Sequence, residues 1–213
     1  MKERKKTVVI LISSLVLLIF GIYFAYYRAK ASAKLTSCTN HVIQLKFIFL
    51  FQLKNSDGLI QLPYDKNLPG YAVIAKINHG TPGPWVNCNH GNPNGWYGGW
   101  QYINLPMETL YKLSVEWKKK NPDKNMPILW CGKGSDLDRC SLDLMSISKV
   151  KKGIDISLLF GSVNKTDIES LNDCLKTIGE NTVSFDIPDG IDWSKYKKKL
   201  ENKEKAWGQG NSH

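Results

Sequence analysis

The stretch from Thr7 to Tyr27, TVVILISSLVLLIFGIYFAYY, determines how this protein is organised. The run has no charged side chain, and as an α-helix it would extend roughly 30 Å, the thickness of the hydrocarbon core of a bilayer. Tyr23, Tyr26 and Tyr27 lie at its C-terminal end, where aromatic side chains favour the membrane–water interface. We therefore predict a transmembrane helix over residues 7–27.

Basic residues flank this span on both sides, in a head at residues 1–6 and again at Arg28 and Lys30. A first hydrophobic segment behind a basic head commonly inserts as a signal anchor. We therefore expect a single-pass membrane protein with a cytoplasmic N-terminus and a periplasmic, or otherwise extracytoplasmic, C-terminal domain. The alternative is a signal peptide cleaved at Ala31-Ser32-Ala33, although the apolar run is longer than the ~7–15 residues of the apolar region in a typical signal peptide.

The formal net charge of +10 invites a nucleic-acid interpretation. The positive charge, however, gathers beside the span and in the tail between Lys195 and Lys205, where anionic lipid headgroups would attract it. We expect the lipid bilayer, and not nucleic acid, to be a partner. Hydrophobic residues make up 42% of the chain, enough for a packed domain beyond the anchor.

The helical pattern continues past the membrane. Residues 28–55 contain neither Pro nor Gly, and apolar residues recur near helical spacing until Asp57-Gly58 supplies a stop. We predict a spine helix over residues 28–55 that enters the domain.

Beyond the spine we predict an α+β domain over residues 56–180, with a small antiparallel sheet packed on the helix, and a basic tail over residues 181–213. The predicted elements are a strand at Tyr71–Ile77, a helix at Met107–Lys120, a strand at Pro127–Cys131, a strand pair or bent strand at Ile154–Val163, and a helix that opens with a capping box at Thr166–Glu169 and ends at Gly179.

Five cysteines are present, and pairing is expected outside the cytoplasm. We favour a disulfide between Cys131 and Cys140, which would close a short loop, and then one between Cys88 and Cys174. Cys38, on the spine helix, is expected to be buried as a thiol. Other pairings stay open because spacing alone does not set connectivity.

Two groups of residues carry metal-ligand chemistry. His79, Cys88 and His90 lie in one loop and would offer three zinc ligands, and Asp136, Asp138 and Asp143 would offer oxygens to calcium. Neither spacing matches a standard site, so we expect no cofactor, with calcium as the candidate kept open.

Aromatic residues crowd the Gly- and Pro-rich loop at residues 78–99 and the segment directly after it, as Trp85, Trp96, Tyr97 and Trp100. Exposed rings would bind glycans or a protein partner, whereas buried rings would fill the core of the sheet, which we favour. No nucleophile elbow, P-loop or HExxH motif is present in the sequence, and we expect a protein that is not an enzyme. A zinc-dependent enzyme is the remaining alternative.

One patch of sequence runs from Arg28 to Lys46, RAKASAKLTSCTNHVIQLK, and is followed by Asp57-Gly58. A second combines MPILWC at Met126–Cys131 with LLFGSV at Leu158–Val163. Together they resemble the prepilin-like proteins of type II secretion and type IV pilus systems, in the branch with a late His-to-Asp-Gly motif that is abundant in planctomycete-type bacteria. The resemblance implies a pilin-like fold and a pseudopilin-like structural subunit that contacts other envelope or secretion-system subunits through its N-terminal helix.

The chain departs from that family at the residues that direct processing. The apolar run begins Lys6-Thr7-Val8, without the Gly-Phe cleavage site, and contains no Glu. Phe160 meets Gly161 directly in the hairpin motif, and Lys151-Lys152 stands about where its His is expected. The resemblance therefore transfers neither filament polymerisation nor a functional site. An anchored module that binds glycans through the aromatic loop is the alternative function.

Overall fold

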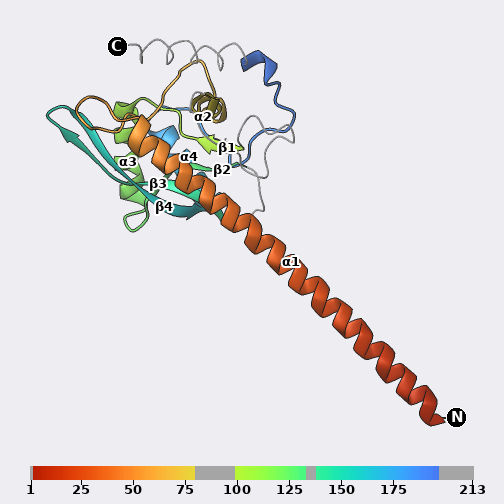
Figure 1. Cartoon of the computed structure of the whole chain (residues 1–213). Helices are drawn as coiled ribbons and strands as arrows, with labels where there is room; N and C mark the ends of the chain where they lie inside the picture. The colour runs from red at the N-terminus through yellow and green to blue at the C-terminus, as the bar shows by residue number, and fades with distance from the viewer. Residues whose placement is uncertain (1, 80–98, 133–137, 197–213) are drawn as a thin grey trace. The chain divides into compact units, whose positions relative to one another are not determined.

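The computed structural model describes residues 2–79, 99–132 and 138–196 (Figure 1). The chain divides into two compact units, Met1–Ser37 and Cys38–His213, which are described separately.

The first unit is formed by helix α1, which runs from Lys2 to Gln52 and therefore continues into the second unit. Its stretch Ile12–Lys30 is long and apolar enough to cross a membrane, and none of that stretch is buried by protein. Large apolar side chains such as Phe20, which is 67% exposed, have no protein neighbour to cover them. The helix predicted over residues 7–55 is confirmed as one continuous helix that ends three residues early.

The second unit has helices packed on a four-stranded antiparallel sheet, which confirms the predicted α+β class. The strands lie in the order β1-β2-β3-β4 (Figure 1). Its remaining elements are α2 (Gly70–His79), β1 (Trp100–Tyr102), α3 (Met107–Lys120), β2 (Met126–Cys131), β3 (Arg139–Val150), β4 (Gly153–Val163) and α4 (Lys165–Thr177).

The segment Tyr71–Ile77 was predicted to be a strand, and this prediction is wrong because it lies in α2. The N–H groups of Ala72 and Val73 both donate to the carbonyl of Pro69, which starts the helix. Residues 72–75 are all buried, so the segment is apolar on nearly every side. A short apolar run of this kind has no period that separates a buried helix from a buried strand.

The segment Ile154–Val163, predicted as a strand pair or one bent strand, lies in the single strand β4, and its partner β3 was not predicted. The two strands form a hairpin in which Val150 pairs with Gly153, a residue with φ of 143°. The helix predicted from Thr166 is confirmed as α4, although the capping box is made by Asn164 and Asp167.

The start of the predicted C-terminal tail belongs to the domain. Phe185, Ile187 and Tyr196 are buried in it, and the ring of Tyr196 lies 6.4 Å from that of Tyr71 on α2. The tail prediction therefore placed the end of the domain too early.

Candidate functional site

The C-terminal end of α1 packs against the sheet within the second unit (Figure 1). Val42, Leu45 and Phe49 follow the spacing of one helix face, and all three are buried. The Phe49 ring meets the Tyr102 ring of β1 edge-on, with centroids 6.4 Å apart. The ammonium of Lys46, also on α1, lies 4.7 Å from the centre of the Phe160 ring on β4. This part of α1 is therefore a core element of the domain.

Another face of the same helix segment is open. Asn40, Gln44 and Phe47 recur at helical spacing and are exposed, Phe47 to the extent of 54%. A large apolar ring beside two amide side chains offers both contact area and hydrogen-bonding groups. These three residues, Asn40, Gln44 and Phe47, are called the open face of α1 below.

A buried carboxylate, Asp143, lies on β3. Its Oδ1 accepts a hydrogen bond of 2.6 Å from the Ser141 hydroxyl. Burial raises the pKa of Asp143, the Ser141 hydrogen bond lowers it, and repulsion from Asp167 raises it, which together place the pKa at about 6. Asp143 can therefore gain or lose a proton near neutral pH.

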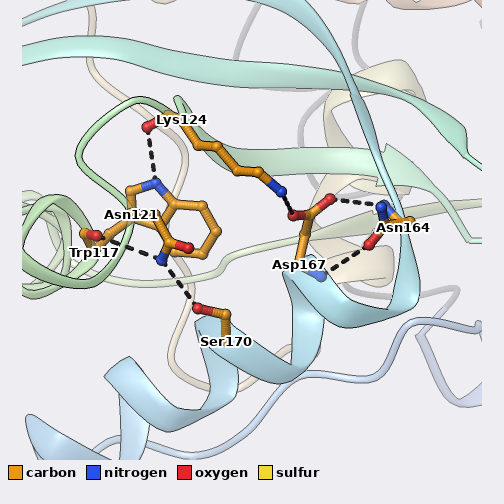
Figure 2. Close-up of polar contacts among 6 residues, drawn as sticks. All are labelled: Trp117, Asn121, Lys124, Asn164, Asp167 and Ser170. Atoms are coloured by element: carbon orange, nitrogen blue, oxygen red, sulfur yellow. Dashed lines mark hydrogen bonds and ion pairs between the residues drawn. The ribbon is translucent and has the colours of Figure 1, made fainter.

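The neighbouring Asp167 ties the loop after α3 to the start of α4 (Figure 2). One of its oxygens lies 2.6 Å from the Lys124 ammonium, and the other accepts the N–H of Asn164 at 3.1 Å. Nearby, the Asn121 amide donates to the Ser170 hydroxyl at 2.9 Å. These contacts are those of a helix cap and a fixed loop, and they engage the groups that might otherwise bind a ligand.

A buried arginine holds the segment after α4 against the sheet. Arg139 Nη1 donates to the carbonyls of Cys131 and Phe185, at 3.3 and 3.1 Å, and its guanidinium carbon lies 3.7 Å from the centre of the Phe185 ring. Its Nη2 lies 2.8 Å from Asp186. The Trp130 indole N–H also donates to the Phe185 carbonyl, at 3.0 Å. Every part of this cluster is engaged within the domain, which indicates a structural role.

Two of the grooves on the described surface are large enough to be considered as binding sites. One, of about 550 Å³, lies beside α3 and includes the exposed apolar side chains Val115 and Met145, and the other, of about 460 Å³, includes Tyr64 and Asn104. Of the two lysines that line the first groove, Lys118 donates to backbone carbonyls and Lys119 lies 2.6 Å from Glu116.

The residues predicted for metal binding are not assembled among the described parts of the chain. His79 ends α2, and Cys88, His90 and Asp136 lie outside the described residues. Asp138 is exposed just before β3, and Asp143 is buried within it. Five residues of extended chain separate them by roughly 16 Å, too far to share one ion directly.

Of the aromatic candidates, Trp100 is fully buried in β1, so the prediction that favoured burial is confirmed for this ring. Trp85, Trp96 and Tyr97 lie outside the described residues. Among the cysteines, Cys131, Cys140 and Cys174 are buried, and no disulfide joins any two of these three. The predicted Cys131–Cys140 bond is therefore absent from the structure, and the predicted Cys88–Cys174 bond is not tested. Cys88, the predicted partner of Cys174, is outside the described residues.

Sequence reasoning named Asp143 only as a candidate calcium ligand, and it missed the buried setting of Asp143 and the Arg139 cluster. Each depends on residues distant in sequence, Asp167 for the first and Phe185 for the second. No family model, characterised protein or solved structure matches this chain.

Proposed function

We propose that this protein is a membrane-anchored, pilin-like structural subunit of the cell envelope that acts by packing against other subunits. The observation that carries the proposal is that two parts of α1 have different surroundings. One helix contains both an apolar stretch without protein cover, Ile12–Lys30, and a face that forms part of a domain core at Val42, Leu45 and Phe49. A bilayer would cover the first, and the sheet covers the second.

The open face of α1 supplies the interaction surface. Phe47 lies five residues before the end of α1 at Gln52 and is 54% exposed, although Leu45 and Phe49, two residues away on either side, are buried. Exposed aromatic rings on a helix are frequent anchors of protein interfaces. The proposed partners are other envelope subunits, of the kind found in type II secretion or type IV pilus machinery, which would pack on α1 from outside the cytoplasm.

The test is co-purification from membranes in mild detergent, with two matched variants. Phe47→Glu places a charge on the open face of α1, and Tyr64→Glu does the same at an aromatic ring outside α1 that is 47% exposed. We expect Phe47→Glu to lose the co-purifying subunits and Tyr64→Glu to keep them. A wild-type protein that is a lone monomer in several mild detergents would contradict the proposed function.

A further inference from the structure

Two cysteines lie at the same end of neighbouring antiparallel strands. Trp130 on β2 pairs with Ser141 on β3, and continuing this register by one residue sets Cys131 opposite Cys140. Directly opposed residues in an antiparallel pair have Cα atoms about 4.5–5.5 Å apart. That separation falls within the range of about 4.4–6.8 Å that disulfides span.

Contacts with α1 place both side chains on the same face of the sheet. Cys140 Sγ lies 3.4 Å from the Thr39 hydroxyl of α1. Leu129, two residues before Cys131, pairs with Tyr102, whose ring meets Phe49 of α1. Since side chains two residues apart on a strand share a face, Cys131 points to the face that α1 covers, as Cys140 does.

Both thiols are shielded from solvent, with Cys131 2% and Cys140 9% exposed. A bond between them would therefore form before this part of the domain closes, or during a local opening of it. Cys174 on α4 is also buried, and it provides a matched thiol outside the pair.

We propose that Cys131 and Cys140 are a disulfide-forming pair, oxidised by exchange with a thiol–disulfide oxidoreductase. Oxidation of the pair in the cell rests on the extracytoplasmic placement in the proposed function. The ability of the two cysteines to form a disulfide does not depend on that placement. One cysteine thiolate attacks the disulfide of the oxidant and forms a mixed disulfide; the other cysteine then attacks this mixed disulfide and displaces the remaining thiolate of the oxidant. The Cys131–Cys140 bond forms, the oxidant disulfide is reduced to two thiols, and those thiols take up the two protons.

The bond would close the connection between β2 and β3 beneath Thr39 of α1. A disulfide stabilises a domain by restricting the unfolded chain, and a short closed loop restricts it only moderately. We therefore expect a Tm about 5–10 °C higher for the oxidised domain than for the reduced domain. The pair would thus lock the end of the sheet on which α1 rests.

The first experiment maps the thiols of the full chain in detergent, after acid quenching of intact cells. Denatured protein is alkylated before and after reduction, and the modified peptides are identified by mass. We expect Cys131 and Cys140 to be protected until reduction and to be found in one cross-linked peptide. Cys131→Ala should expose Cys140 to alkylation, Cys140→Ala should expose Cys131, and Cys174→Ala should change neither.

The second experiment separates the pair from its compartment. Purified, reduced full chain is incubated with oxidised glutathione. A pair that is reduced in cells but forms the cross-link here supports the geometry and counts against the extracytoplasmic placement. A pair that forms no cross-link in either setting, or that cross-links instead to Cys38 or Cys88, overturns the proposal. The Tm of Cys131→Ala/Cys140→Ala should not respond to reductant, whereas that of Cys174→Ala should fall as in the wild type.

Discussion

The carboxylate of Asp143 on β3 occupies the space that a side chain at Gly161 on β4 would need. Gly161 pairs with Ser141, whose hydroxyl bonds the same carboxylate. A glycine on one strand therefore makes room for a buried acid on its neighbour.

Gly161→Ala is expected to destabilise the domain by about 1–3 kcal/mol, because the added methyl group would meet the Asp143 carboxylate. Chemical denaturation measures the loss. In a double-mutant cycle, Asp143→Ala should remove most of the penalty of Gly161→Ala. Additive effects of the two substitutions would show that the carboxylate is not what limits the space.

The stability of the domain is expected to fall as pH rises through the pKa of Asp143, about 6. The folded state holds this proton more tightly than the unfolded state, in which the pKa is near 3.8. The favourable contribution is thus complete below about pH 4 and is lost above about pH 6. Asp143→Asn should therefore be more stable than the wild type at pH 7, by at most about 3 kcal/mol.

The measurement is denaturant unfolding at pH 4, 5, 6 and 7. Asp155→Asn, at an exposed acid on β4, is the control and should leave the pH dependence as it is in the wild type. A pH dependence that Asp143→Asn leaves unaltered would assign the effect to another group.

Alanine substitutions at Phe49 and Phe47 are expected to differ in their effect on the free energy of unfolding. Phe49→Ala removes a fully buried ring from the core and should lower the free energy of unfolding by about 3–5 kcal/mol. Phe47→Ala, on the open face of α1, should change it by less than about 0.5 kcal/mol. Thermal unfolding of both variants in the same detergent provides the comparison, and equal losses would mean that Phe47 is covered in the folded subunit.

Phe20→Arg is expected to weaken membrane insertion, because an arginine near the centre of a span costs about 2.5–3.5 kcal/mol on insertion scales. Phe20→Leu is the apolar control and should remain in the membrane fraction after alkaline extraction. The intact mass of the wild type from washed membranes complements this test. Loss of everything through Ala33, with the protein in the soluble fraction, would show that the apolar stretch is a cleaved signal and not an anchor.

Local signals carried most of the helix predictions. Met107–Lys120 was predicted and found because Pro106 precedes a stretch with one apolar face, and Gly179, with φ of 79°, follows α4 as expected. The strand predicted at Pro127–Cys131 was also found, as β2 (Met126–Cys131), because a short apolar run lies between turn residues.

Local signals failed where partners were needed. β3 mixes buried Leu142 with exposed Lys149, and it is a strand because β4 and β2 supply its hydrogen bonds. Trp100 directly follows a segment rich in Gly, Pro and Asn, which is typical of a loop, yet its pairing with Cys131 buries it in β1. β-structure depends on neighbours more than helix does, so its position is less visible in a single segment.

The sequence by itself determined the long N-terminal helix, its apolar stretch and the α+β class. These follow from length, composition and period, which are properties of a segment alone. Only the tertiary structure decided the helical state of Tyr71–Ile77, the setting of Asp143 and the opposition of Cys131 and Cys140. Those features arise when distant segments exclude water and align their backbones, and no single segment carries that information.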